Sequence, residues 1–132
     1  MALVLDVRLP ADPSAFAEAR ARLERLRSRV DDEVVEDTEL LASEVVANSI
    51  RHSRLRPSDE LRLQAELDPG KLVVRVSDPG PGFRPGPGKP VPRPFGGGWG
   101  LVLLDRLAER WGVEPDDGGS TVWFELPARQ AA

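Results

Sequence analysis

Three patterns in this sequence combine residue types and spacings that could form a ligand site. The first is Glu44, Asn48 and His52, which recur at intervals of four residues. In a helix this spacing aligns the side chains on one stripe, beside the apolar residues Leu41 and Val45. A carboxylate and an amide on a buried face are costly unless something pairs with them. The stripe predicts an oxygen-ligand site, with Asn48 offering a carbonyl to magnesium and Glu44 acting as a base. It also fits a helix edge, with an exposed Glu44 bonded to Asn48.

The second pattern is Asp78-Pro79-Gly80-Pro81-Gly82, which follows an apolar stretch typical of a strand. A carboxylate at a strand end can accept a hydrogen bond from an exocyclic amino group such as that of adenine. The glycines let the backbone approach a ligand closely. The same residues also fit an ordinary Asp-Pro-Gly turn.

The third pattern is Gly96-Gly97-Gly98-Trp99-Gly100, followed at once by an apolar helical stretch from Leu101. Glycines that lead into a helix N-terminus expose unpaired amides at the positive end of the helix dipole, which suits an anion. A flexible linker is the alternative. The helix that begins directly afterwards favours phosphate binding.

Composition narrows the chemistry. The chain has 132 residues, no cysteine and one histidine, which fits one domain without thiolate or multi-histidine metal sites. Magnesium is the metal expected with oxygen ligands. A net charge of −4 argues against general nucleic-acid binding. The chain has neither a signal-peptide pattern nor an apolar run near the roughly 18 residues of a membrane span. We therefore expect a cytoplasmic protein that contacts neither nucleic acid nor membrane. Dinucleotide, P-loop and serine-hydrolase motifs are also missing.

The elements that position these patterns follow from apolar periodicity. Alternation predicts strands over 3–9, 60–67, 71–78 and 120–126, and a short segment at 111–114. Helices are expected over 13–30 with Asp12 as N-cap, from Asp37 or Thr38 to about Ser53, and from about Trp99 to Arg110. Seven prolines between Pro79 and Pro94 exclude both helix and strand there, which is typical of a lid, a binding loop or a disordered segment. The order predicts an α+β fold with helices on one face of a mainly antiparallel sheet.

Taken in order, the three patterns resemble the N, G1 and G2 boxes of the GHKL ATPases, which include gyrase, Hsp90, histidine kinases and MutL. The stretch 41–52 and the ending 118–126 are similar to the anti-sigma factor serine/threonine kinases, especially actinobacterial ones. The resemblance covers essentially the whole chain. It implies a Bergerat-type two-layer sandwich, with one ATP-binding domain over 1–132 and a short lid at about 83–97.

The resemblance also implies a role for individual residues. Asn48 would coordinate the Mg²⁺ that bridges the ATP phosphates, and Glu44 would be the general base. Asp78 would bind the adenine amino group. The remaining implied contacts are Gly80 and Gly82 at the adenine pocket, Thr121 on the adenine side, Gly98, Gly100 and Leu101 at the phosphates, and Arg51 and His52 near them.

The implied function is a kinase that sequesters a sigma factor and phosphorylates a STAS-like anti-sigma antagonist, with a homodimer as a further expectation. The alternative is an ATP-dependent regulatory binding module without catalysis. The sequence departs from better-known members in its short, proline-rich lid, which carries Arg84, Lys89 and Arg93 but no acid. Trp99 is also a bulky residue between the glycines of the third box.

Overall fold

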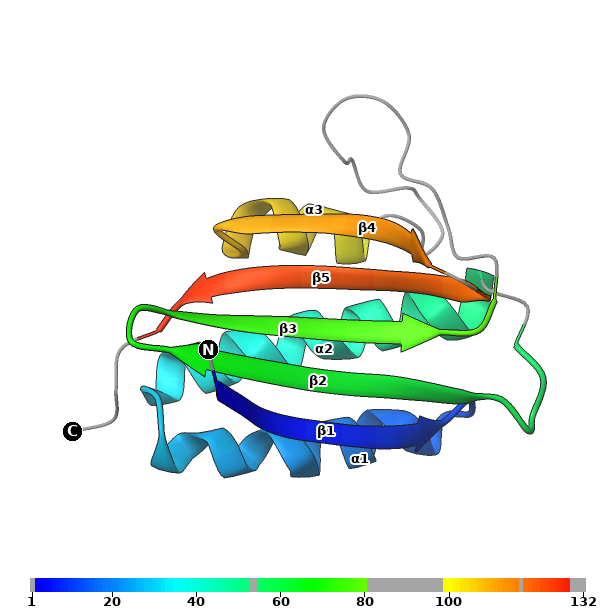
Figure 1. Ribbon diagram of the computed structural model, residues 1–132, viewed down its shortest axis with the longest axis horizontal. Coiled ribbons are helices and arrows are strands. Elements are labelled where there is room, and N and C mark those ends of the chain that lie inside the picture. Colours follow the sequence, from blue (N-terminus) through cyan, green and yellow to red (C-terminus); the bar gives the residue numbers. More distant parts are fainter. Residues whose placement is uncertain (1, 53–54, 81–98, 117, 129–132) are drawn as a thin grey trace.

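The computed structural model describes residues 2–52, 55–80, 99–116 and 118–128, which form two layers (Figure 1). One layer is a five-stranded antiparallel sheet in the order β1-β2-β3-β5-β4, and the helices cover one of its faces. The predicted α+β fold is confirmed. The strands are β1 (Ala2–Pro10), β2 (Glu60–Asp68), β3 (Lys71–Asp78), β4 (Arg110–Asp116) and β5 (Gly119–Pro127). The helices are α1 (Ser14–Leu23), the 3₁₀ helix η1 (Glu24–Ser28), α2 (Asp32–His52) and α3 (Trp99–Leu107).

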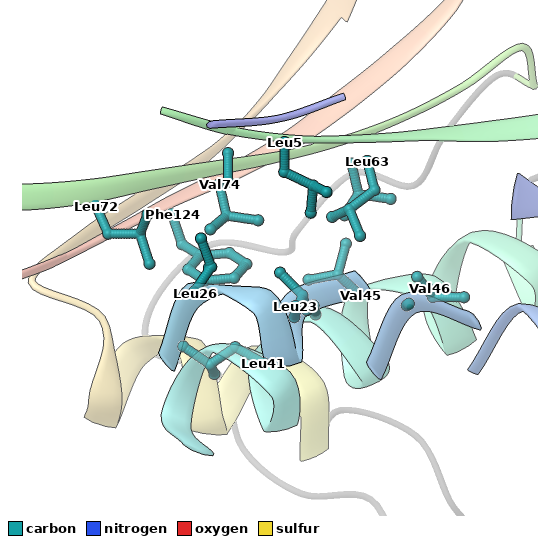
Figure 2. Close-up of a cluster of buried hydrophobic side chains, with 14 of the residues drawn as sticks. Leu5, Leu23, Leu26, Leu41, Val45, Val46, Leu63, Leu72, Val74 and Phe124 are labelled. Atoms are coloured by element: carbon teal, nitrogen blue, oxygen red, sulfur yellow. The ribbon is translucent and has the colours of Figure 1, made fainter. Parts of the chain in front are cut away.

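Alternating apolar residues build the core between the layers. The inward residues of β2, Leu61, Leu63 and Ala65, are fully buried, as the sequence pattern predicts. Figure 2 shows sheet residues meeting helix residues in one cluster, among them Leu5, Leu63, Leu72, Val74 and Phe124 from the strands and Leu23, Leu26, Leu41, Val45 and Val46 from the helices. This cluster fixes α2 against the centre of the sheet. In the described part of the chain, no helix is both long enough and apolar enough to cross a bilayer.

The first predicted helix, 13–30, is divided in the structure. It begins at Ser14, because the Asp12 carboxylate accepts the Ser14 backbone N–H at 2.8 Å and so holds the chain just before the first turn. After Leu23 the chain tightens into η1. The Arg27 side chain bonds to Glu24, three residues earlier, and i and i+3 side chains lie directly above one another in a 3₁₀ helix.

The second helix starts at Asp32, so the predicted start at Asp37 or Thr38 is wrong. Thr38 looked like an N-cap, but its hydroxyl donates to the Val34 carbonyl at 2.7 Å, a contact made inside a helix. Asp32 and Glu33 lie in the first turn, where negative charge suits the helix dipole. A threonine can cap a helix N-terminus or bond a carbonyl inside a helix, so the residue type alone does not locate the start of α2.

The third helix ends at Leu107 rather than Arg110, and the expected short segment at 111–114 is the longer strand β4. The Ala108 N–H still bonds the Leu104 carbonyl at 3.0 Å, but the Glu109 N–H donates to the Glu125 carbonyl at 2.8 Å. The chain therefore joins the sheet at Glu109. Pairing with β5 at the sheet edge decides this boundary, and such pairing is invisible to local periodicity.

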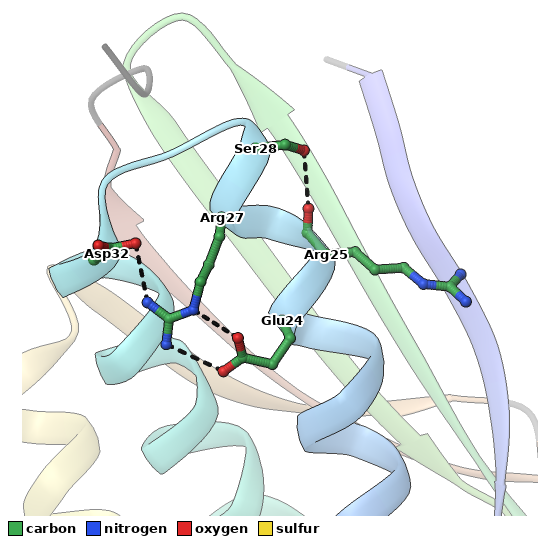
Figure 3. Close-up of polar contacts among 5 residues, drawn as sticks. All are labelled: Glu24, Arg25, Arg27, Ser28 and Asp32. Atoms are coloured by element: carbon green, nitrogen blue, oxygen red, sulfur yellow. Dashed lines mark hydrogen bonds and ion pairs between the residues drawn. The ribbon is translucent and has the colours of Figure 1, made fainter.

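A polar cluster joins η1 to the start of α2 (Figure 3). The Arg27 guanidinium holds the Glu24 carboxylate at 2.6 and 3.1 Å and reaches Asp32 at 3.0 Å. Glu39, only 8% exposed, lies beside this cluster, and its Oε1 has no hydrogen-bond partner among the described residues. Burial, and then a hydrogen bond with the Glu24 carboxyl, raise the pKa of Glu39 to about 7. The hydrogen bond from Arg27 lowers the pKa of Glu24 to about 2, so Glu39 carries the proton of this pair.

The raised pKa makes the stability of the fold depend on pH through Glu39. The folded state binds this proton more tightly than the unfolded chain does, so its contribution is present at pH 4 and is lost as pH rises toward about 7. Glu39→Gln replaces the donating O–H of the protonated carboxyl with an amide N–H, and the amide cannot ionise. We expect its free energy of unfolding to rise relative to wild type by on the order of 1–2 kcal/mol between pH 4 and 8. Urea unfolding at both pH values measures this difference, with Glu18→Gln, exposed on α1, as the control. Parallel pH profiles for Glu39→Gln and wild type would contradict the expectation.

Candidate functional site

At one end of the sandwich α2 ends, β3 ends and β5 begins (Figure 1). Several polar side chains from these elements are buried, among them Asn48, Asp78 and Ser120. Asn48 of α2 is 8% exposed, Asp78 of β3 is 7% exposed and Ser120 of β5 is 4% exposed. α2 packs directly on β3 and β5, so the three residues belong to elements in contact. Buried polar groups are costly unless satisfied, and their concentration at one end marks it as the candidate site.

The structure places two of the three side chains of the predicted stripe on α2, Glu44 and Asn48. Asn48 is buried and Glu44, one turn earlier, is half-buried, so Glu44 is not the exposed helix-edge residue of the alternative interpretation. Among the described residues, neither side chain is seen in a hydrogen bond or ion pair. The amide and carboxylate thus retain hydrogen-bonding capacity that the described part of the fold does not use. His52 is the last residue of α2, and its side chain lies outside the description.

Asp78 lies at the last position of β3. One of its carboxylate oxygens accepts the Gly80 backbone N–H at 2.8 Å, so the predicted Asp-Pro-Gly turn is present. Turn formation does not require burial, because Asp68 makes the same contact with the Gly70 N–H at 3.1 Å from an exposed turn at the other end of β3. Strand alternation turns the Asp78 side chain inward with Val74 and Val76, onto the helix-covered face. The turn and the buried carboxylate are therefore both present.

Ser120 is a candidate site residue that the sequence patterns do not identify. The register of β3 and β5 pairs Asp78 with Ser120 and Ser77 with Thr121. Ser120 therefore shares the inward face with Asp78, whereas Thr121 lies on the opposite face, where its hydroxyl bonds the Ser77 hydroxyl at 2.8 Å. Extending the alternation of the buried Val122 and Phe124 backward by two residues would have identified Ser120.

The structure describes only some of the other residues predicted to contact the ligand. Arg51 is exposed on the last turn of α2. Gly100 and Leu101 lie in the first turn of α3, and the Leu101 side chain is half-buried against the core. Gly82, Gly98 and the predicted lid at 83–97 lie outside the described residues. Within the described chain, no group of three or more histidine, aspartate or glutamate side chains could hold a metal ion, so a metal here would depend on few protein ligands.

A cavity of about 300 Å³ lies at the other end of α2 and does not suit a nucleotide. Asp31, Glu33 and Asp37 line it together with the apolar residues Val34, Leu107, Leu126 and Pro127. Burial, followed by the neighbouring Glu33 and Glu36, raises the pKa of Asp37. An acidic lining without a basic residue repels polyphosphate, so the end that contains Asn48 and Asp78 is the candidate site.

Comparisons with known proteins agree with this fold. Two similar proteins are the serine-protein kinases RsbW of Listeria innocua serovar 6a and Listeria monocytogenes serovar 1/2a. Each is 30% identical over 131 residues, covering 89% of this chain and 83% of the relative.

Two solved structures share the fold. The RsbU and RsbW domains of Rv1364c from Mycobacterium tuberculosis match with a TM-score of 0.69 and 21% identity over 96% of this chain, which spans 32% of that longer one. The histidine kinase domain of the blue-light activated histidine kinase from Erythrobacter litoralis EL346 matches with a TM-score of 0.53 and 21% identity, over 89% of this chain and 61% of that one.

The family model described as histidine kinase-like ATPase domain matches residues 9–126, from the end of β1 to nearly the end of β5. The resemblance drawn from the three sequence patterns is thereby confirmed at the level of the family. This chain belongs to the histidine kinase-like ATPase domain family.

Proposed function

We propose that this chain is an ATP-dependent serine/threonine protein kinase of the anti-sigma factor type, which phosphorylates an anti-sigma antagonist and regulates a sigma factor. The observation that carries the proposal is the burial of Asn48 and Asp78 at one end of the sandwich, with Glu44 one helical turn from Asn48. The RsbW relatives are named serine-protein kinases, which supports the same chemistry here.

In this proposal, Asp78 recognises the adenine base. Its buried carboxylate accepts a hydrogen bond from the exocyclic amino group, while the Gly80 N–H keeps the carboxylate oriented. Ser120 is paired with Asp78 on the inward face and supplies a second polar contact beside it. Thr121 was the residue implied by resemblance, and Ser120 is better oriented for that role.

Asn48 would hold Mg²⁺ through its side-chain carbonyl, an oxygen ligand of the kind that this ion prefers. A buried amide with no partner among the described residues fits this task. When bound, the ion neutralises charge on the phosphates. The exposed Arg51, with the backbone at Gly100 and Leu101 in the first turn of α3, adds positive potential nearby. Gly82, Gly98, His52 and the lid at 83–97 keep the roles that the resemblance implies.

Glu44 is the general base. The hydroxyl oxygen of a serine or threonine on the antagonist attacks the γ-phosphorus, and Glu44 takes the hydroxyl proton. The bond from the γ-phosphorus to the bridging oxygen breaks, and ADP leaves with the electron pair. The chain contributes positioning and charge neutralisation, which supply most of the catalysis in phosphoryl transfer.

The partners follow from this activity. A sigma factor and a STAS-like antagonist would both bind near the nucleotide, and a homodimer of this chain is a further proposal. A cytoplasmic location supplies ATP and both partners. The competing function, a non-catalytic ATP-dependent binding module, uses every element of this site except Glu44.

The adenine role of Asp78 is tested by Asp78→Asn. The amide preserves the oxygen that accepts the Gly80 N–H but removes the charge, so we expect affinity for Mg-ATP to fall about 10- to 100-fold. Asp68→Asn is a matched control, because Asp68 makes the same backbone contact in a turn at the other end of β3. Calorimetric titration with ATP measures both variants. Equal losses in the two variants would show that only turn geometry is involved.

The catalytic role is tested by Glu44→Ala. We expect phosphoryl transfer from labelled ATP to a candidate antagonist to fall by at least about 100-fold, while the dissociation constant for Mg-ATP changes little. Glu36→Ala, exposed on the same helix, is the control. Unchanged transfer in Glu44→Ala would remove the general-base role. Tight ATP binding by wild type with no transfer to any antagonist would favour the non-catalytic module.

A further inference from the structure

The geometry points to Gly119 as a positioning residue that sets adenine specificity, because it lets the β3 backbone at Asp78 lie directly against the start of β5. This inference rests on the proposed function, since it concerns the same nucleotide pocket. It assigns a task to a residue that would touch no part of the ligand.

The contact at Gly119 is made with backbone atoms. A Cβ built on Gly119 would overlap the Asp78 carbonyl oxygen, and would lie 3.0 Å from the Asp78 carbonyl carbon and 3.0 Å from Pro79 Cα. Side chains can rotate out of a clash, but these atoms cannot. Glycine in a strand often marks such a close backbone approach.

Space, not backbone conformation, is what Gly119 provides. Its neighbour Gly118 has φ of 82°, in the left-handed region, and lies in open space. Among the described glycines, only Gly118 has positive φ. Any side chain at position 119 must therefore push the end of β3 away, because Gly119 is itself held by its pairing with Asp116 of β4.

The backbone atoms of Asp78 and Pro79 that would be displaced also orient the Asp78 carboxylate. Asp78 pairs with Ser120, the residue after Gly119, and its carboxylate holds the Gly80 N–H at 2.8 Å. A shift of the Asp78 and Pro79 backbone therefore moves the adenine acceptor and its turn together. Binding of the phosphates, which depends on α2 and α3 in the proposal, is affected much less.

The experiment compares Gly119→Ala with three other glycine variants. Gly112→Ala is also crowded, though less so, and its Cβ would meet the Trp123 ring at 2.9 Å and not the β3 backbone at Asp78. Gly118→Ala strains the hairpin without a clash, and Gly70→Ala adds a methyl group in open space. The readout is the ratio of dissociation constants for inosine triphosphate and ATP, because inosine has a carbonyl in place of the adenine amino group.

We expect wild type to prefer ATP by at least about 10-fold, and Gly119→Ala to lose most of that preference while its affinity for inosine triphosphate changes less than about threefold. The three control variants should keep the wild-type ratio, even where they unfold at lower urea concentrations. This split separates positioning from stability.

A folded Gly119→Ala that keeps the wild-type ratio overturns the inference and leaves ATP binding intact. A wild-type protein with no preference for ATP overturns the proposed adenine recognition itself. If Gly119→Ala is unfolded in buffer, the ratio is measured in an osmolyte such as trimethylamine N-oxide, which favours compact states. A variant that stays unfolded there, while Gly112→Ala folds, assigns Gly119 a purely structural role and also overturns the inference.

Discussion

The pairing of β3 with β5 up to their last residues is the constraint on which the candidate site depends. Because Asp78 still has a partner, Ser120, where the strand ends, its carboxylate points under the helical layer and not into solvent. Burying a carboxylate is unfavourable unless its oxygens are hydrogen-bonded, and the Gly80 N–H is one of the groups that bond Asp78. The apolar cluster between the sheet and α2 holds the helical layer over this end of β3, so the stability of the core maintains the candidate site.

Glu39 is also a buried carboxyl group, but its environment differs from that of Asp78. Glu39 avoids an unpaired charge by keeping its proton, with Glu24 and the Arg27 fork beside it, whereas Asp78 is oriented by a backbone amide. A protonated acid suits a helix junction that only has to hold elements together, and an oriented acceptor suits ligand recognition. The electrostatics are also uneven along the molecule, since the acidic cavity at the far end of α2 disfavours anions. In a chain with a net charge of −4, this distribution is consistent with the proposal that a polyphosphate binds at the opposite end.

Much of this arrangement could be predicted from sequence, because alternation along 60–67 and 71–78 reports directly on a two-layer core. The start of α2 could not, since the Thr38 hydroxyl can cap a helix or bond within one. The resemblance implies Thr121, whereas the inward position of Ser120 follows from strand alternation once the register of β3 and β5 is known. The close approach at Gly119 is beyond any single-sequence pattern. It depends on the register between two strands separated by the proline-rich segment and α3.

Whether the site catalyses a reaction depends on Glu44, because a binding module would share every other residue. Folding gives no evident reason for an acid at this position. Glu44 is half-buried one turn from Asn48, and in the described part of the chain it makes no ion pair or hydrogen bond that would stabilise α2. Alanine would favour the helix more, since it has the highest helix propensity. The proposed kinase gives this carboxylate a use that the helix does not, because it would accept the proton of the attacking hydroxyl.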